Sequence, residues 1–366
     1  MIPTFEKALP LPAALVEALK KTEQNPRYHA EGNVYNHILL VLKQIEEYLD
    51  RFDLTEEERI VLYWTGLLHD IGKATATKWQ NGRWKAHGHE IAGIAPAREI
   101  LLNQPEITSQ QRKKILDLVR WHSVPRKWMA RQASLEEYIL LHTRTDLRLL
   151  GIFGWFDMAG RICDRKAENM HLLDTFNQEI VPEVIRQVGS FDTLQKAYQQ
   201  ADYQRKNTLW SAYNWKNVRL LKKLLQAPAP AQPVRSHWFC VVPIGLPNEK
   251  LQQYLEQYFP QHPRFQLSGK PYAEADHTAR QSMERSMRNF ISVYAESSRS
   301  ILIEGPFWKK ELREIMTQAV RHQGGQLHFL YLEQGSETSD DHRNLQKYLQ
   351  LPHPWEAHKL EIQELR

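Results

Sequence analysis

The chain has 366 residues, of which 42% are hydrophobic and 25% are charged, proportions that belong to a soluble globular protein long enough for two domains. Its formal net charge of +5 favours an anionic partner, and its two cysteines, Cys163 and Cys240, are too few for a disulfide framework. No apolar run reaches the length of a membrane span, and the charged start of the chain does not have the pattern of a signal peptide. We therefore expect a cytoplasmic protein with no membrane partner.

The first part of the chain is predicted to be helical. A short helix at residues 13–21 is followed by a longer one, in which apolar residues recur at helical spacing from Val34 to Leu49. His37 lies at the edge of this apolar stripe, where its side chain can face the interior. A lone histidine in such a place is more often a satisfied core residue than a ligand, so His37 alone predicts no function.

The next predicted helix leads into a histidine–aspartate pair. Thr55 and Glu58 have the spacing of a capping box at its start, and His69 and Asp70 follow its most apolar turn, before Gly72 ends it. Burying an imidazole beside a carboxylate is costly unless something replaces the lost water. A divalent metal ion would do so, because neutral imidazole and ionised carboxylate are both good ligands.

More ionisable side chains follow on later helices. His89 lies in the first turn of one, His122 shares the apolar face of a helix that starts at Ser109, and a helix with a capping box starts at Ser134. Asp157 follows Phe153 by one turn on the next helix. Each residue alone is more often structural, but together they are hard to satisfy without a shared partner. Nitrogen and oxygen ligands without cysteine suit Mn, Fe, Co, Ni, Zn or Mg, and the pattern does not choose among them.

This order of histidines and aspartates on an all-helical frame resembles the HD phosphohydrolase superfamily. Four stretches are similar to a narrower group, the HD domains of bacterial CCA-adding enzymes and of the HD–polynucleotide kinase RNA end-repair proteins. They are Tyr-His-Ala-Glu-Gly-Asn-Val-Tyr-Asn-His (28–37), Leu-Leu-His-Asp-Ile-Gly-Lys (67–73), Gly-His-Glu (88–90) and Phe-Asp-Met-Ala-Gly-Arg (156–161). The resemblance covers roughly residues 25–165 and implies an HD fold for this part of the chain.

The resemblance also implies a role for each matching residue. A first metal ion would be held by His37, His69, Asp70 and Asp157, and Asp70 would be able to bridge to a second ion. His89 and His122 would hold that second ion or contact the phosphate. Lys73 and Arg161 would place positive charge where oxyanion charge grows, and His29 would lie near the site. One or two divalent ions are expected, which would form hydroxide from water for in-line attack at phosphorus.

A basic stretch surrounds His122. Residues 111–131 contain seven Lys or Arg against one acid, Asp117, and Trp121 and Trp128 lie among them. Charge interleaved with aromatic rings is typical of RNA binding, although charged runs are more often solvated helix faces. Because this run adjoins His122, we interpret it as a substrate channel. Its candidate contact residues are Arg120, Arg126 and Lys127.

The second part of the chain is predicted to be a separate α/β domain. The proline-rich segment 227–235 separates residues 1–226, the HD domain with a basic helical extension, from residues 236–366. Beyond it, predicted strands at 237–244, 264–267, 300–304 and 326–332 alternate with predicted helices at 249–258, 276–296, 308–323 and 340–349. This alternation predicts a parallel sheet.

Residues 238–253, together with the later strands and residues 351–357, resemble a P-loop polynucleotide kinase. The catalytic residues of that family are missing. Where the loop needs Gly, Lys and Ser or Thr, this chain has Lys250, Leu251 and Gln252, and the turn 267–270 lacks an aspartate. We therefore interpret this part as a degenerate kinase-like domain that uses no ATP. RNA binding, dimerisation or support of the HD domain remain open as its role.

The predicted function is that of a metal-dependent phosphohydrolase acting on RNA ends, with tRNA as one candidate. It would remove a 2′-phosphate or open a 2′,3′-cyclic phosphate. One alternative is a phosphohydrolase of nucleotides or signalling nucleotides, and another is an RNA- or protein-binding module with a structural metal site. Lys73 argues against the last, because a structural site needs no phosphate-facing cation. The sequence leaves the metal, the substrate and the oligomeric state open.

Overall fold

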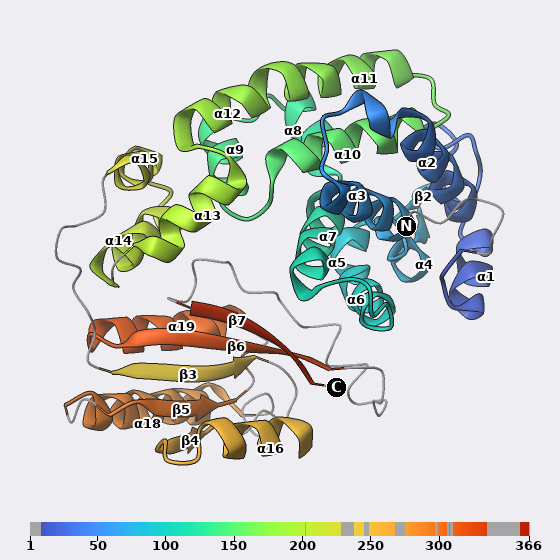
Figure 1. Cartoon of the computed structure of the whole chain (residues 1–366). Helices are drawn as coiled ribbons and strands as arrows, with labels where there is room; N and C mark the ends of the chain where they lie inside the picture. The colour runs from blue at the N-terminus through green and yellow to red at the C-terminus, as the bar shows by residue number, and fades with distance from the viewer. Residues whose placement is uncertain are drawn as a thin grey trace. The chain divides into compact units, whose positions relative to one another are not determined.

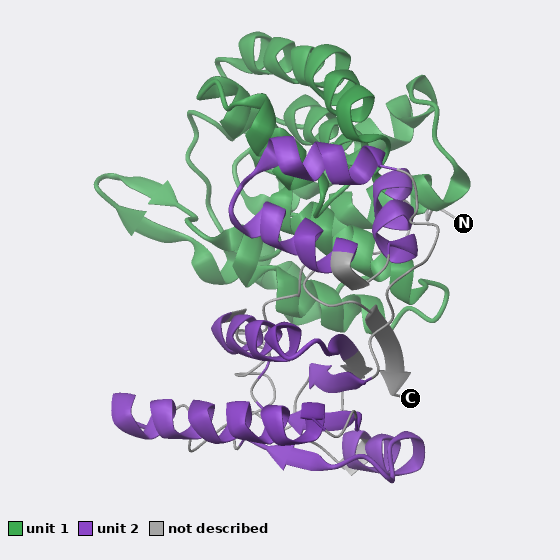
Figure 2. Cartoon of the chain, turned by 90° about the vertical axis from the view of Figure 1, so that its left-hand side faces the viewer, with its two compact units in different colours: residues 1–191 green, residues 192–366 purple. Residues whose placement is uncertain are grey.

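The chain divides into two compact units, residues 1–191 and 192–366, which are coloured separately in Figure 2. The computed structural model describes residues 9–201, 203–227, 238–244, 249–267, 275–296, 299–305, 307, 310–334 and 359–365 (Figure 1). Within these residues no helix is both long enough and apolar enough to cross a membrane.

Unit 1 is built mainly of helices. They are α1 (Ala13–Lys21), α2 (Val34–Tyr48), η1 (Leu49–Arg51), α3 (Glu56–Leu68), α4 (Lys73–Ala76), α5 (His89–Ala92), α6 (Ile94–Leu102), α7 (Ser109–Trp121), α8 (Val124–Ala130), α9 (Leu135–His142), α10 (Leu147–Ala159), α11 (Lys166–Thr175), η2 (Phe176–Ile180) and α12 (Val181–Val188). Three of them begin with complete capping boxes, which satisfy backbone N–H groups that would otherwise lack partners. The pairs are Thr55 with Glu58, Thr108 with Gln111, and Ser134 with Glu137.

Helices α2, α3, α7 and α10 pack against one another at the centre of unit 1. Helix α3 is buried at every position from Val61 to Leu68, and α10 is buried at nearly every position. Gly160, just after α10, allows that helix to approach α2 closely. A Cβ at this position would lie 2.8 Å from the backbone nitrogen of Val41, closer than real contacts allow. The close packing brings the end of α10 against the middle of α2, at Val41.

A small β-hairpin interrupts the helical order, and the sequence interpretation missed it. Strand β1 (Lys78–Gln80) pairs antiparallel with β2 (Arg83–Lys85). The connecting residues Asn81 and Gly82 both have positive φ, 52° and 72°, as a tight two-residue hairpin turn requires. The Asn-Gly dipeptide is a strong sequence signal for such a turn and could have revealed the hairpin.

Unit 2 contains a five-stranded sheet in the order β4-β5-β3-β6-β7, with every neighbouring pair parallel, so the predicted parallel sheet is confirmed. Its strands are β3 (Phe239–Ile244), β4 (Arg264–Gln266), β5 (Ile301–Glu304), β6 (Gln326–Gln334) and β7 (Lys359–Leu365). Helices α18 (His277–Glu296) and α19 (Lys310–His322) bury apolar residues against one face of β3, and α16 (Glu249–Tyr258) covers the other. Strand β7 was not predicted.

Helices α13 (Phe191–Gln200), α14 (Tyr203–Asn214) and α15 (Val218–Gln226) precede the sheet in sequence. The sequence placed its domain boundary after them, at segment 227–235, whereas the structure divides the chain before residue 192. A contact with α19 supports this grouping, because the Arg321 guanidinium lies 5.6 Å from the ring centre of Trp210 on α14. Several predicted features lie outside the described residues. They are most of the proline-rich linker, the phosphate-loop positions 245–248, positions 268–270, the helix at 340–349 and residues 351–357.

Candidate metal centre

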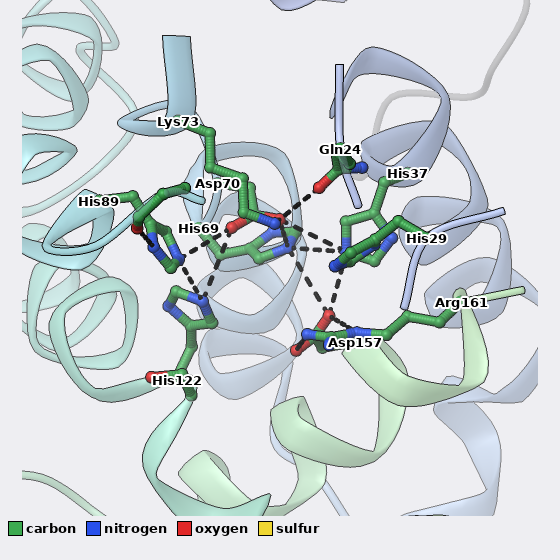
Figure 3. Close-up of polar contacts among 12 residues, drawn as sticks. Gln24, His29, His37, His69, Asp70, Lys73, His89, His122, Asp157 and Arg161 are labelled. Carbon is green, nitrogen blue, oxygen red and sulfur yellow. Dashed lines mark hydrogen bonds and ion pairs between the residues drawn. The ribbon is translucent and has the colours of Figure 1, made fainter. Parts of the chain in front are cut away.

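The six predicted ligands come from five separate parts of unit 1 and meet in one buried cluster (Figure 3). His37 lies in the first turns of α2, and His69 and Asp70 directly follow Leu68, the last residue of α3. His89 is the first residue of α5, His122 follows the last residue of α7, and Asp157 lies in the last turn of α10. Because most of these residues stand at helix ends, their positions depend on where each helix starts or stops.

Four of the ligand atoms form a first group. His37 Nε2 lies 3.0 Å from Asp157 Oδ1, 3.3 Å from His69 Nε2 and 3.5 Å from Asp70 Oδ2, and His69 Nε2 lies 3.2 Å from Asp70 Oδ2. Ligand atoms held at about 2.1 Å from one metal ion are about 3.0 to 3.4 Å from each other. The spacing of the first group therefore fits a single ion.

The other oxygen of Asp70 faces a second group. Asp70 Oδ1 lies 3.2 Å from His89 Nε2 and 3.7 Å from His122 Nε2, and these two nitrogens are 3.3 Å apart. Asp70 thus contributes one oxygen to each group. Two groups of three histidine or carboxylate side chains that meet around Asp70 could each hold a metal ion.

The hydrogen bonds of the histidines determine which ring nitrogens can act as ligands. The Nδ1 atoms of His69, His89 and His122 lie 2.7 to 2.9 Å from backbone carbonyl oxygens, which can only accept. Each Nδ1 therefore carries the proton, and in the neutral ring each Nε2 presents a lone pair. Two lone pairs facing each other at 3.3 Å repel unless a cation lies between them.

The carboxylate of Asp70 also lacks the hydrogen-bond partners that burial normally requires. Neither oxygen of Asp70 accepts a well-aligned hydrogen bond, although the side chain is 1% exposed. Burial alone would raise the pKa of Asp70, but the charge of Lys73 holds it well below its ordinary value. Burial would likewise raise the pKa of Asp157, which Arg161 and His37 hold well below its ordinary value. Two ionised carboxylates among lone-pair nitrogens fit a divalent ion.

Residues 34–149 match the family model of the HD domain. This chain carries an HD domain. Two curated relatives, both named "Multifunctional CCA protein" and from Neisseria gonorrhoeae strains NCCP11945 and ATCC 700825 / FA 1090, are 34% identical to the chain over 110 residues. The aligned part is 30% of this chain and 24% of each relative, so the chain matches about a quarter of the relatives' length. No solved structure matches the chain significantly.

The HD domain match includes five of the six clustered residues, and Asp157 lies beyond it. HD domains bind divalent metals, and the cluster of histidines and aspartates agrees with that property. The match and the cluster together support a metal-dependent hydrolase in general terms.

Two cations border the cluster. Lys73 Nζ lies 2.7 Å from Asp70 Oδ2 and donates to the side-chain oxygen of Gln24, also over 2.7 Å. Arg161 donates to both oxygens of Asp157, over 3.1 Å and 2.5 Å. Burial alone would lower the pKa of Arg161, but Asp157 raises it, so the guanidinium stays charged. Both residues were predicted to lie beside the cluster, and both do.

Glu31 is a residue of this site that the sequence interpretation missed. Its carboxylate is buried, with Oε1 at 2.7 Å from His29 Nδ1 and 3.0 Å from His37 Nδ1. The backbone N–H of Ile162 donates to Oε2 over 3.0 Å. Burial would raise the pKa of Glu31, but His29 and His37 lower it. Glu31 belongs to the motif at residues 28–37, so its presence between two histidines of that motif was a usable signal.

Gly72 permits the second group to form. The sequence interpretation gave it the role of ending α3, but that helix already ends at Leu68. A Cβ at Gly72 would lie 2.1 Å from the carbonyl oxygen of His89 and 2.4 Å from the backbone nitrogen of Gly93. Only glycine allows α5 to approach this closely, and the approach places His89 against Asp70.

A cavity of about 350 Å³ adjoins the cluster. The predicted substrate contacts His29, Arg126 and Lys127 line it, together with Asp70, His89 and His122. The structure does not bring Arg120 to the cavity wall. Its guanidinium instead lies 4.6 Å from the ring centre of Trp121, within α7. The hairpin residues Arg83, Trp84 and Lys85, which were not predicted as site residues, also line the cavity.

Proposed function

We propose that this chain is a metal-dependent phosphohydrolase that acts on RNA ends, where it removes a 2′-phosphate or opens a 2′,3′-cyclic phosphate. The observation that carries the proposal is the position of Asp70, whose two oxygens face two groups of ligand atoms beside a cavity. A pair of ions on either side of one carboxylate suits in-line displacement at phosphorus, since it offsets charge on both the attacking and the leaving oxygen.

In this proposal His37, His69, Asp70 and Asp157 hold one ion, and Asp70, His89 and His122 hold the other. When bound, the ions would supply hydroxide at neutral pH and would offset the charge of the phosphate. Their chemical identity stays open among Mn, Fe, Co, Ni, Zn and Mg, because each accepts nitrogen and oxygen ligands.

The protein's own cations bind and orient the phosphate. Lys73 is held in place by Gln24 and Asp70, so its charge is fixed beside the cluster before the substrate arrives. Arg126 lines the cavity and forms no ion pair with another residue in the described part of the chain. Burial, followed by the charge of Arg161, lowers the pKa of Arg126. A half-buried guanidinium without a carboxylate partner suits a phosphate group.

His29 has a different role in the proposal. Burial, with the charges of Lys73 and Arg161, lowers its pKa to about 2, so the ring is neutral at physiological pH. Its Nδ1 donates to Glu31, which leaves Nε2 as an acceptor. A neutral acceptor at the cavity wall suits a ribose hydroxyl rather than a phosphate. This pairing supports a substrate in which the phosphate is attached to ribose.

The choice of RNA rests on charge and on the relatives. Among the described residues that line the cavity, six are Lys or Arg, whereas Glu23 and Asp70 are the acids. The cations are Lys73, Arg83, Lys85, Arg126, Lys127 and Arg161. The relatives are named as CCA proteins, and a name of that kind suggests contact with nucleic acid. The partner we propose is therefore an RNA end, with a tRNA end as one candidate.

We also propose that unit 2 is kinase-like and uses no ATP. Leu251, at the position of the phosphate-binding lysine, is buried in a core cluster with Val241 and Leu302. Gln252, at the position of the magnesium-binding hydroxyl, donates from Nε2 to Glu304 Oε2 over 2.7 Å. Both side chains are thus occupied within the fold. Full-length protein is expected to show no ATP hydrolysis and no ATP-dependent phosphorylation of RNA.

The test of the main proposal is phosphate release from short RNAs that end in a 2′-phosphate or a 2′,3′-cyclic phosphate, with Mn²⁺, Co²⁺ or Ni²⁺ added. Ring opening frees no phosphate by itself, so that product is followed by its altered chromatographic mobility. Asp70→Ala should lose turnover while retaining RNA binding. Turnover of free nucleotides alone would redirect the assignment to nucleotide metabolism or signalling. Metal and RNA binding without any turnover would leave a binding module.

A further inference from the structure

The hairpin formed by β1 and β2 has two chemically different faces. The strand register pairs Lys78 with Lys85, Trp79 with Trp84, and Gln80 with Arg83. Residues paired across a hairpin share a face, and neighbours along a strand alternate. One face therefore carries both tryptophans, and the other carries three cations and Gln80.

The side chains of the hairpin are not packed in the hydrophobic core. All three residues of β1 are exposed, and those of β2 are exposed or half-buried. Figure 2 shows the hairpin as two green arrows that project from the helices of unit 1. Trp79 is 59% exposed, so most of its ring surface faces water. Leaving a tryptophan and a lysine-rich face in water does little for folding and instead suits a binding partner.

The charges of the hairpin lack partners within the described residues. No carboxylate of the described chain forms an ion pair with Lys78, Arg83 or Lys85. Lys78 and Lys85 lie directly opposite each other, and like charges in that position destabilise a strand pair. A two-stranded hairpin is only marginally stable, so this repulsion is a real disadvantage unless an anion offsets it.

The hairpin is also fixed at the edge of the cavity. Trp84 Nε1 donates to Glu23 Oε2 over 2.9 Å, and both residues line the cavity. The ring of Trp79 packs edge-to-face against Trp84, with 5.1 Å between the ring centres and 71° between the planes. Trp79 is therefore held beside the cavity without lining it.

We propose that the β1–β2 hairpin binds the single-stranded nucleotides that precede the reacting end of the RNA. A base stacks on the ring of Trp79, and the phosphates of the strand contact Lys78, Arg83 and Lys85. Arg83, Trp84 and Lys85 all line the cavity, so a strand that runs along the β2 edge reaches the aromatic face and the cationic face together. Aromatic rings that stack on bases, combined with cations that contact phosphates, are the means by which proteins bind single strands without reading their sequence. This inference rests on the proposed function, since it assigns the path of the RNA towards the same cavity.

The experiment compares a single-stranded RNA of ten nucleotides that ends in a 2′-phosphate with a mononucleotide that carries the same phosphate. Full-length protein with Mn²⁺ is used, and both RNA affinity and kcat/KM are measured. Trp79→Ala should weaken RNA binding by about tenfold or more, because one base–aromatic stack is lost. Its kcat/KM for the mononucleotide should stay within about twofold of the original, because the ring lies outside the cavity.

Two control variants separate stacking from damage to the hairpin. Trp79→Phe should recover much of the RNA affinity, since it restores a ring, whereas Gln80→Ala on the same strand should behave like the original protein.

The phosphate contacts are tested separately. Arg83→Gln should reduce the slope of log affinity against log salt by about 0.7, the value for one phosphate contact to a single strand.

Unchanged RNA affinity in Trp79→Ala, or equal losses on RNA and mononucleotide, would overturn the inference. The same experiments can contradict the proposed enzymatic function without contradicting the hairpin assignment, and the hairpin assignment without contradicting the function. If the protein binds RNA through Trp79 but turns over no RNA end, the hairpin assignment stands and the enzymatic one falls. If Trp79→Ala processes RNA ends as well as the original protein does, the enzymatic assignment stands and the hairpin assignment falls.

Discussion

The Nε2 atoms of His89 and His122 lie 3.3 Å apart, and both present lone pairs because each Nδ1 donates to a backbone carbonyl. This pair defines the second group around Asp70. Replacing His122 with Asn should remove one ion and leave the first group intact. We expect the metal content of purified protein to fall from two ions per chain to one, measured by elemental analysis. The matching variant His37→Asn should also lose one ion, and a His122→Asn protein that retains both would contradict the two-group interpretation.

Glu31 lies 3.0 Å from Nδ1 of His37, a residue of the first group. Carboxylates that hold a ligand histidine in place typically contribute about 10- to 100-fold to metal affinity. Glu31→Gln keeps the size of the side chain and removes its charge. We expect the affinity for one of the two ions to fall by about that factor, measured by competition with a metal-binding dye. Equal affinity in the variant would show that Glu31 does not position His37.

Lys73 supplies charge beside Asp70 without being a ligand. Lys73→Met should retain both ions but lower kcat by about 10²-fold, because a fixed charge near the reacting phosphate is lost. The control is Lys113→Met. Lys113 lies near the start of α7, at the opposite end from His122, and its ammonium pairs with Asp117. That variant should keep its activity. Loss of metal from Lys73→Met, with activity restored by excess Mn²⁺, would assign the lysine to the support of Asp70 instead.

Gly72 and Gly93 provide a graded test of how closely α5 must approach Asp70. A Cβ at Gly72 would lie 2.1 Å from the carbonyl oxygen of His89, whereas a Cβ at Gly93 would lie 3.2 Å from the same atom. Gly72→Ala should destabilise the fold by about 1 to 3 kcal/mol, because the backbone must move. It should also lower the affinity of the protein for one of the two ions. Gly93→Ala should cause a smaller loss of both the free energy of unfolding and the metal affinity. Denaturant unfolding and metal titration measure these two quantities. The opposite order would exclude close approach as the role of Gly72.

The low pKa of His29 predicts a dependence of stability on pH. Burial, with the charges of Lys73 and Arg161, lowers that pKa to about 2, whereas a histidine in the unfolded chain has a pKa near 6.5. Below pH 6.5 the unfolded chain binds a proton that the folded chain does not, so stability decreases as the pH falls from 6.5 towards 2. Between pH 7.5 and 5.5 this residue should account for a loss of about 1 kcal/mol.

The measurement is denaturant unfolding of metal-free protein at both pH values, since acid would otherwise also release metal. His29→Asn should show a smaller loss than the original protein, because Asn does not titrate. If both proteins lose the same free energy of unfolding, His29 does not remain neutral in the folded chain.

Local sequence signals predicted much of the fold. The helices predicted at residues 13–21 and 249–258 have those bounds in the structure, and the capping boxes at Thr55 and Ser134 form as expected. These features depend on neighbouring residues, which a sequence displays directly. Strand β7 was missed even though Leu360 and Ile362 alternate with polar residues, because one short alternation without flanking signals is weak.

The site shows where sequence reasoning stops. The ligand set came from periodicity and resemblance, and the structure brings all six residues together. Which oxygen of Asp70 faces which histidines depends on the packing of α5 and α7, and no local pattern encodes it. The role of Gly72 also depends on a segment 17 residues away at His89, so the sequence alone indicated only a helix end. Arg120 was placed by its neighbours in sequence, yet its position on α7 turns it towards Trp121.

The ligand atoms of the two groups come from α2, α3, α5, α7 and α10, so an ion bound among them joins segments from residue 37 to residue 157. An unfolded chain cannot gather these atoms, and an ion that binds the folded chain alone stabilises it in proportion to the logarithm of its concentration. The melting temperature of unit 1 should therefore rise steadily as free metal is added. Thermal unfolding thus becomes a titration of the metal centre that needs no knowledge of the substrate.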